Sequence, residues 1–263
     1  MSNPDFVLTD LNKGVLNIRL NRPKVNAFNF EVIESIQDAF KQATRDSEVR
    51  CVLLTGSGKV FSAGQDISEF RQAEEISFRS HLQRTYNPLV KQIRNLEKPV
   101  LAALNGAVSG AALGIALACD VRIASENARF VVGFLGIGLA PDSAVSLLLP
   151  ALIGLGRASE FAFLNTPISA EQALSWGLVN RVVSAADLDQ QATEWAEQLA
   201  QGPVGAMGLA KRDFNKAVLW NLDQVLDYEA HIQEVAGHRD EHEEGVQAFL
   251  EKRSPRYTGS EPS

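Results

Sequence analysis

The sequence predicts an α/β fold in which short buried strands alternate with helices. Its first half repeats a strand, a glycine-bearing loop and a helix, and its second half is patterned almost entirely for helix. Strands that are joined through helices pair in parallel, with right-handed crossovers. The composition is that of a globular protein, since 45% of the 263 residues are hydrophobic and 22% are charged.

The first predicted elements are a strand pair and a helix. Residues 6–8 and 15–20 are short apolar segments joined by the turn-forming Asn12-Lys13-Gly14. Pro23 ends the second strand, because proline cannot donate to a strand ladder. Residues 29–44 then carry apolar side chains at helical spacing, at positions 32, 33, 36, 39, 40 and 43.

Two continuous apolar strands follow, at residues 50–56 and 100–104. Strands of this kind are covered on both faces. The segment between them, residues 77–96, is helical in pattern and ends before Pro99. Each strand is followed by a loop that contains glycine, and ligands of α/β folds bind at the carboxyl ends of strands. These two loops are therefore candidates for a functional site.

The remaining elements are two short strands, at 121–124 and 128–132, and a series of helices. An extended segment at 179–183 interrupts the series. Ser169 is a candidate N-cap and Gly177 a candidate C-cap of one of these helices. The predicted helices span residues 156–164, 169–176, 186–201, 203–218, 221–236 and 241–252.

Charge and cysteine usage exclude several classes of function. A net charge of -7 at pH 7 argues against a nucleic-acid partner. The sequence contains no run of about 18 apolar residues, so no membrane span is predicted. The start, MSNPDFVLTD, shows no secretory signal. Cys51 and Cys119 lie in apolar contexts and are predicted to be buried free thiols of a cytoplasmic protein.

Three sequence features suggest a cofactor or metal site but are not specific enough to predict one. Gly154-Leu155-Gly156 offers G-x-G without the third small residue of a dinucleotide-binding loop. His238 and His242 lie four residues apart in HRDEH, which is not the zinc-binding H-E-x-x-H, so an exposed helix face is predicted there. His81 is interpreted as a surface residue or a satisfied core residue. No metal site and no nucleophilic triad are predicted.

Residues 105–150 carry the strongest chemical signal. Gly110 and Gly114 lie among small apolar residues at the start of a helical pattern. A helix N-terminus with small side chains presents bare N–H groups, which favour a negative charge. Further on, Asp142 follows Pro141 in an apolar context. Donors for an anion together with one acid indicate catalysis, while tight helix packing with Asp142 as a helix cap is the alternative.

Separated motifs occur in a specific order along the chain: Leu20-Asn21-Arg22-Pro23, Asn26-Ala27-Phe28, Phe61-Ser62-Ala63-Gly64-Gln65-Asp66, Ala118-Cys119-Asp120 and Lys252-Arg253. Together they resemble the crotonase family, the enoyl-CoA hydratases and isomerases. The resemblance implies a ββα superhelical core over residues 1–200 that holds a CoA-thioester site. It also implies that residues 201–263 form a helical region that builds homo-trimers or hexamers and covers the active site.

The ligand that the resemblance implies is an acyl-CoA thioester, with coenzyme A as part of the substrate and no separate cofactor. By position, the thioester oxygen lies between the backbone N–H groups of Gln65 and Ala111. One preset donor of this kind is worth about 10²–10³ in rate. Cations are expected near the coenzyme's phosphates, with Arg22, Lys24, Lys59, Lys252, Arg253 and Arg256 as candidates. Further substrate contacts are expected from Ala63, Gly64, Gln65, Asp66, Ile67, Gly110 and Phe134.

The predicted acid and base is Asp142, in the position where certain isomerases of the family carry theirs. Hydratases of the family place two glutamates in the site, and the matching positions here are Gly114 and Phe134. Shifting a double bond needs only a proton moved between two carbons, which one carboxylate can do. Apolar neighbours are expected to raise the pKa of Asp142. The interpretation is an isomerase that shifts a double bond, or rearranges a ring epoxide, of an enoyl-CoA thioester.

Residues 86–90 and 244–259 resemble the phenylacetate-pathway branch of the family. Residues 143–146 depart from the glycine-containing run expected there, so the sequence does not predict which acyl group the pocket binds. The alternatives are an enoyl-CoA hydratase and a non-catalytic CoA-thioester-binding or assembly subunit. An aspartate-dependent dehalogenase ranks below them, because it would pair its aspartate with tryptophan where this chain has Phe134.

Overall fold

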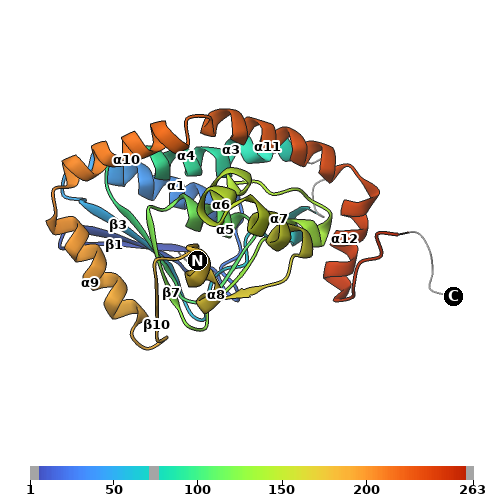
Figure 1. The fold of residues 1–263 in the computed structure, drawn as a ribbon, viewed down its shortest axis with the longest axis horizontal. Helices are drawn as coiled ribbons and strands as arrows, with labels where there is room; N and C mark the ends of the chain where they lie inside the picture. Colours follow the sequence, from blue (N-terminus) through green and yellow to red (C-terminus); the bar gives the residue numbers. More distant parts are fainter. Residues whose placement is uncertain (1–5, 71–76, 259–263) are drawn as a thin grey trace, which may run out of the picture.

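Two sheets form the centre of the computed structural model, which describes residues 6–70 and 77–258 (Figure 1). Two terminal segments lie outside the described residues. They are residues 1–5, which belong to the start inspected for a secretory signal, and residues 259–263 of the predicted C-terminal region. The larger sheet has the order β1 (Val7–Asn12), β2 (Val15–Leu20), β3 (Cys51–Gly56), β5 (Val100–Leu104), β7 (Val121–Ser125) and β10 (Arg181–Val183). Its neighbours are parallel except for the hairpin of β1 and β2.

The smaller sheet has the order β4 (Val60–Ser62), β6 (Ala107–Ser109), β8 (Arg129–Val131) and β9 (Ile168–Ser169). Each of the strands β3, β5 and β7 is followed by one short strand of this sheet, so the chain winds through both sheets in repeated turns. The sequence predicted β8, but it placed β4 in a loop and assigned no strand to the residues of β6. Both β4 and β6 lie beside glycines, and a strand of three residues shows too little pattern to be told from a glycine-bearing loop.

Helices cover both faces of the larger sheet. Alternate residues of β3 face opposite sides: Val52 and Leu54 belong to the main core, whereas Leu53 packs in a second cluster with α9 (Leu188–Gln201). The main core includes α1 (Phe30–Arg45), whose first turn is capped by the Asn29 side chain at 2.9 Å from the Val32 N–H. Burial on both faces explains why β3 and β5 are continuously apolar.

The predicted helix at 77–96 is wrong as a single element, because it is broken at Thr85 into α3 (Phe78–Arg84) and α4 (Tyr86–Asn95). Pro88 has no N–H to donate to the Arg84 carbonyl. That carbonyl instead accepts from the Gln37 side chain at 3.3 Å. The break therefore has a local cause, and it turns the end of α3 and the start of α4 toward the same cavity.

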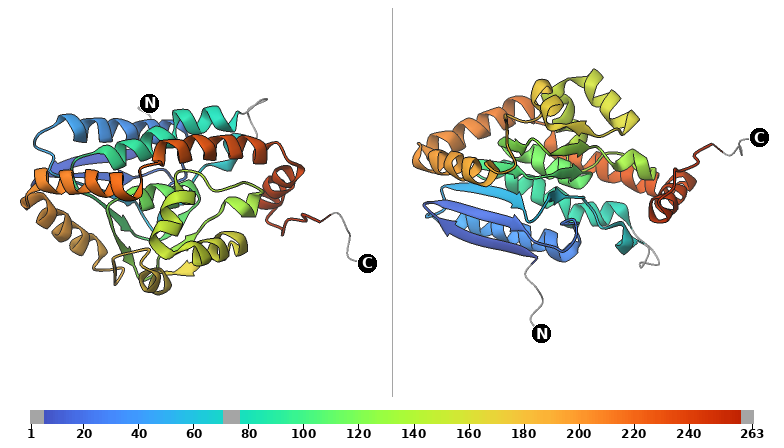
Figure 2. Two further views of the ribbon diagram at one scale, coloured as in Figure 1. Left: turned by 45° about the horizontal axis from the view of Figure 1, so that its top comes forward. Right: turned by 90° about the horizontal axis from the view of Figure 1, so that it is seen from below.

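The second half is helical, as predicted. α6 (Val145–Ile153) contains Pro150 and precedes the first of the helices predicted for this half. The following helices are α7 (Leu155–Leu164), α8 (Ala170–Trp176), α10 (Val204–Val218), α11 (Leu222–Gly237) and α12 (Asp240–Glu251). The helices α9 and α12 lie at opposite ends of the molecule (Figure 2). The predicted boundary at residue 200 falls at the end of α9, and the separate role of the region beyond it stays a prediction.

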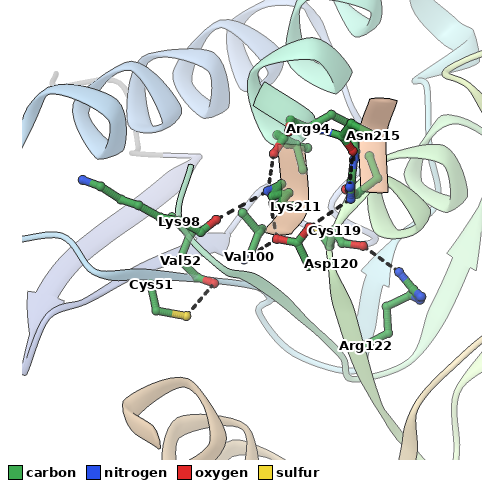
Figure 3. Close-up of polar contacts among 12 residues, drawn as sticks. Cys51, Val52, Arg94, Lys98, Val100, Cys119, Asp120, Arg122, Lys211 and Asn215 are labelled. Carbon is green, nitrogen blue, oxygen red and sulfur yellow. Dashed lines mark hydrogen bonds and ion pairs between the residues drawn. The ribbon is translucent and has the colours of Figure 1, made fainter. Parts of the chain in front are cut away.

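A buried ionic cluster fastens α10 to the core (Figure 3). Asp120 accepts from Arg94 of α4 at 3.0 Å and from Lys211 of α10 at 2.8 Å. Its second oxygen also accepts from the Val100 N–H at 2.9 Å, and Asn215 accepts from the Arg94 Nε at 3.0 Å. Each buried charge thus has a partner, which offsets its loss of hydration and sets the position of α10.

Two sequence predictions about burial are answered by the fold. Cys51 and Cys119 are buried free thiols, as predicted, and burial raises the pKa of each to about 12. In residues 6–70 and 77–258, none of the helices combines the length and apolar character needed to cross a bilayer. The cytoplasmic location stays a prediction.

Candidate active site

A cavity of about 410 Å³ brings together most of the residues predicted from the sequence. Its wall includes the three predicted catalytic residues, Gln65, Ala111 and Asp142. Of the predicted substrate contacts, it also includes Ala63, Asp66, Ile67, Gly110 and Phe134. Arg22, Lys24 and Gly64 lie outside the wall. The two glycine-bearing loops predicted as candidates therefore meet in one place.

Gly64 is required where the loop after β4 approaches α5 (Ala111–Ala118). Its φ angle is 80°, in the left-handed region. A Cβ atom at this position would lie 2.5 Å from the Ser109 carbonyl oxygen and 3.4 Å from the Ala111 nitrogen. The missing side chain is what lets Gln65 lie beside the start of α5.

The backbone N–H groups of Gln65 and Ala111 are not used by the secondary structure around them. In the parallel bridge to Phe28, the Gly64 carbonyl accepts at 2.7 Å and the Asp66 N–H donates at 2.8 Å. Since successive amides of an extended segment point in opposite directions, the Gln65 N–H faces away from Phe28. Ala111 is the first residue of α5, and the first N–H groups of a helix have no intrahelical acceptor.

The side chain of Gln65 is held in place. Its Oε1 accepts from the Tyr86 hydroxyl at 2.5 Å and from the His81 Nε2 at 3.2 Å. Burial lowers the pKa of His81 to about 4, so the imidazole is neutral at pH 7. Both residues line the cavity. The interpretation of His81 as a surface residue or a satisfied core residue did not place it in this cavity, because the break at Thr85 could not be seen in the periodic pattern.

Asp142 is buried in the cavity wall, with 6% of its surface exposed. Its Oδ1 accepts from the Ser143 hydroxyl at 2.6 Å, and its Oδ2 accepts from the Gln233 amide at 2.7 Å. No cation pairs with it in the described part of the chain. Burial raises the pKa of Asp142 to about 6, although the two hydrogen bonds oppose the shift. A carboxylate with this pKa is ionised at neutral pH and is more basic than an exposed one.

The alternative reading of Asp142 as a helix cap is wrong. α6 begins after two residues with left-handed backbone, Ser143 at φ 56° and Ala144 at φ 64°. The side chain that accepts from its first N–H groups is Glu229 of α11, at 2.8 Å from the Ala144 nitrogen and 3.0 Å from the Ser146 nitrogen. Burial raises the pKa of Glu229 to about 7, with Asp142 nearby adding to the shift. These bonds offset the cost of the left-handed turn that presents Asp142.

Asp66, the other acidic residue found in the described cavity wall, has a different environment. It accepts from Arg22 at 2.7 Å. Partial burial acts to raise the pKa of Asp66, but hydrogen bonds from Ser68 and Arg22 outweigh it and the pKa is lowered. Asp66 is therefore a poor base. Arg22 is not part of the cavity wall, but the ion pair with Asp66 holds it next to the wall.

The other predicted cations and histidines do not converge on the cavity. Lys24 and Lys59 are exposed, and Arg253 pairs at 2.6 Å with both Glu244 and Glu251. His238 lies on an exposed face, as predicted. The prediction is wrong for His242, which is buried and donates from Nδ1 to the Ile137 carbonyl at 2.7 Å. Among the residues that the structure describes, no group of three or more potential ligands could hold a metal ion.

Comparison with known proteins decides the family. The model of the enoyl-CoA hydratase/isomerase family matches residues 10–260 of this chain. The chain belongs to the enoyl-CoA hydratase/isomerase family. Both the family assignment and the crotonase fold predicted from the sequence are confirmed.

Similar proteins of the enoyl-CoA hydratase/isomerase family include proteins named as isomerases and proteins named as hydratases. The 1,2-epoxyphenylacetyl-CoA isomerase of Escherichia coli is 41% identical, over 97% of this chain and 99% of its own. The trans-2-decenoyl-acyl-carrier-protein isomerase of Streptococcus mutans is 33% identical, over 96% and 98%. The crystal structure of an enoyl-CoA hydratase from Mycobacterium avium subsp. paratuberculosis has a TM-score of 0.88, with 36% identity over 96% of this chain and 98% of that one.

For a member of the enoyl-CoA hydratase/isomerase family, positions 114 and 134 are informative. Gly114 is buried in α5 against the turn that carries Asp142. A Cβ atom there would lie 2.4 Å from the Ser143 carbonyl oxygen and 2.6 Å from the Ser143 Cβ. Any longer side chain at position 114 would displace the turn. Phe134 begins a short 3-10 helix (Phe134–Ile137) and contributes an apolar surface to the cavity.

Proposed function

We propose that this member of the family is an isomerase of enoyl-CoA thioesters, with Asp142 as its acid and base. The observation that carries the proposal is the environment of Asp142. It is a buried carboxylate without a cationic partner among the described residues, and it lines the same cavity as Gln65 and Ala111. A base and two backbone donors are the groups that formation of an enolate requires.

In the proposed reaction, the thioester oxygen accepts from the N–H groups of Gln65 and Ala111. Asp142 removes a proton from C2 of a 3-enoyl thioester, and the electron pair spreads onto the thioester oxygen. The protonated Asp142 then returns a proton to C4, which leaves the double bond between C2 and C3. The carboxylate is regenerated and no water is consumed. Coenzyme A takes part only as a portion of the substrate.

The name of the Escherichia coli relative suggests a ring epoxide as a second substrate type. The same base and the same two donors would serve an enolate formed beside such a ring. Arg22 and Lys24 remain the proposed contacts for the coenzyme's phosphates. Arg22 has the stronger support, because its partner Asp66 lines the cavity.

Hydration is the second candidate function, because hydratases occur among the similar structures. Two features of the site favour isomerisation over it. The Gly114 position has no room for a glutamate unless the Asp142 turn moves, and Phe134 has no group that transfers a proton. A non-catalytic thioester-binding subunit is the third candidate, and it would have no need of a buried base.

A substrate screen tests the proposed function. Purified protein is incubated in D₂O with a series of 3-enoyl-CoA thioesters, and the conjugated 2-enoyl product is followed by ultraviolet absorbance. We expect isomerisation together with deuterium at C2 or C4, and slow or absent hydration of crotonyl-CoA. Rapid hydration would contradict the proposal in favour of a hydratase. Binding of the thioesters without proton exchange would favour the non-catalytic subunit.

We also propose that the protein assembles as a trimer or as a dimer of trimers. Its C-terminal region exposes large apolar side chains, among them Phe214 on α10 at 67% and Trp220, between α10 and α11, at 69%. Monomeric proteins rarely leave extended apolar patches in water.

Light scattering on a size-exclusion peak measures the assembly. At micromolar protein we expect three or six times the chain mass of 28.6 kDa. Phe214→Glu should lower the mass, since it places a charge in the apolar surface. Lys216→Glu, on the exposed surface of the same helix, is the matched control. A monomer mass for the unmodified chain would contradict the proposed assembly.

A further inference from the structure

We propose that Gln233, on α11, is a positioning residue for Asp142 whose amide remains hydrogen-bonded to the acid in both of its protonation states. The inference rests on the proposed role of Asp142 as acid and base. It assigns to the C-terminal helical region a part in catalysis, in addition to the predicted roles in assembly and in covering the site.

The first observation is the contact itself. The Gln233 Nε2 donates to the Asp142 Oδ2 at 2.7 Å, and Gln233 is 1% exposed. Little of either side chain is exposed to water, which would otherwise compete for this bond. Hydrogen bonds to an ionised acceptor are short and strong, and a low dielectric strengthens them further. Together with the Ser143 hydroxyl on Oδ1, the amide fixes both carboxylate oxygens.

The second observation is an unused acceptor on the same side chain. The Gln233 Oε1 is buried and has no hydrogen-bond partner among the described residues. A buried acceptor without a partner costs free energy, so such an atom calls for an explanation. The terminal torsion of glutamine is roughly two-fold, and half a turn about it exchanges the oxygen and the nitrogen in nearly the same space.

The two observations fit the two halves of the proposed cycle. While Asp142 is ionised, the Gln233 N–H donates to it. Once Asp142 carries the proton taken from the substrate, half a turn of the amide presents Oε1 to the acid O–H. The amide then holds the carboxyl group in place for the return of the proton to another carbon.

The same helix also fixes the backbone around the acid. Glu229 lies one turn before Gln233 on α11 and accepts from the Ala144 and Ser146 nitrogens. One residue of α11 thus holds the turn, and the other holds the carboxyl group that the turn presents. Both contacts join segments more than 80 residues apart, since the separations are 85 and 91 residues for Ala144 and Asp142.

Other titratable groups near the cavity must be separated from this effect. Glu229 lies behind Asp142 and titrates in the same range, because burial raises its pKa to about 7. From α3, His81 is neutral, since burial lowers its pKa to about 4. From the loop after β4, Asp66 is held ionised by Ser68 and Arg22. Glu229→Gln removes the neighbouring Glu229 charge together with one of the two acceptors that hold the turn, so its pH profile is compared with that of Gln233→Met.

The test is the pH dependence of kcat/KM for isomerisation in Gln233→Met, which keeps the side-chain length and removes both polar atoms. The amide bonds to Asp142 in both protonation states, but its bond to the ionised form is charge-assisted and therefore the stronger of the two. Loss of both bonds should move the acid limb, which is the fall of kcat/KM at low pH, upward by about one pH unit. Ser143→Ala should move the limb in the same direction, because it removes the donor to the other oxygen. We expect kcat to fall more than KM changes. Gln247→Met, at an exposed glutamine of α12, is the matched control and should change neither the acid limb nor kcat.

A second variant keeps the test decisive if Gln233→Met does not fold. Gln233→Glu places a second carboxyl group against Asp142, and two such groups share a proton. Its acid limb should move further upward than that of Gln233→Met. An unchanged acid limb in the folded variants would overturn the inference and leave a packing role only. Absence of isomerisation in the unmodified protein would instead overturn the proposed function, before any variant is compared.

Discussion

Asp142→Asn is expected to lower the rate of double-bond isomerisation by about 10²–10⁴-fold. Asparagine keeps the shape of the side chain and its reach for Ser143 and Gln233, but it removes the basic oxygen. The carboxylate is 6% exposed, and the other acidic residue of the described cavity wall, Asp66, is ion-paired with Arg22, so we expect Asp66 not to replace the lost base. Single-turnover kinetics with a 3-enoyl-CoA substrate measure the loss.

The loss should fall on the chemical step and not on binding. Affinity for the thioester is expected to change little in Asp142→Asn, because the N–H groups of Gln65 and Ala111 are untouched. Asp66→Asn removes the other acidic side chain named in the cavity wall and should cause a smaller loss, expressed mainly in KM. Unchanged isomerisation in a folded Asp142→Asn variant would remove Asp142 from the mechanism.

The same carboxylate sets the pH dependence of the unmodified protein. Asp142 accepts a proton only when it is ionised, and burial raises its pKa to about 6. The ionised fraction therefore falls as the pH drops through about 6, and kcat/KM should fall with it. The base stays ionised at higher pH, so this group causes no alkaline loss. The residual activity of Asp142→Asn should lack the acid limb.

Ala111→Pro is expected to lower the isomerisation rate by about 10² or more, because proline has no N–H to stabilise the developing oxyanion. The position favours survival of the fold. Ala111 is the first residue of α5, where proline is best tolerated in a helix, and the residue before it is the permissive Gly110. Steady-state kinetics should show the loss in kcat.

Ala111→Gly is the matched control, since it also changes the side chain but keeps the N–H group. It should retain most of the activity. Circular dichroism and thermal unfolding establish that both variants are folded. A folded proline variant with full activity would exclude the oxyanion role of Ala111, whatever the outcome at Asp142.

The Gln65 side chain shows where the interpretation of the sequence was too simple. If only the backbone N–H of Gln65 acts, its side chain has no defined task. In the structure, its Oε1 accepts from Tyr86 and His81, so the side chain anchors the segment that carries the N–H. Both partners lie beside the break at Thr85, which the apolar periodicity of residues 77–96 conceals.

The sequence by itself determined the alternation of strands and helices and the family, and it singled out Asp142 as the candidate acid. Continuous apolar strands at 50–56 and 100–104, the helical spacing of apolar residues in 29–44 and the apolar context of Asp142 are local patterns. Local patterns report burial and turn chemistry directly, because each depends on a few neighbouring residues. For the same reason they predicted that the pKa of Asp142 would be raised.

Only the tertiary structure decided which groups surround the acid. Gln233 and Glu229 reach the Asp142 turn from a helix that begins some 80 residues later, and no local pattern encodes their convergence. Gly64 illustrates the same limit, since its need for a missing Cβ depends on the distance to Ser109 across the smaller sheet. Contacts of this kind are set by how helices and sheets pack, so they appear only when the whole chain is folded.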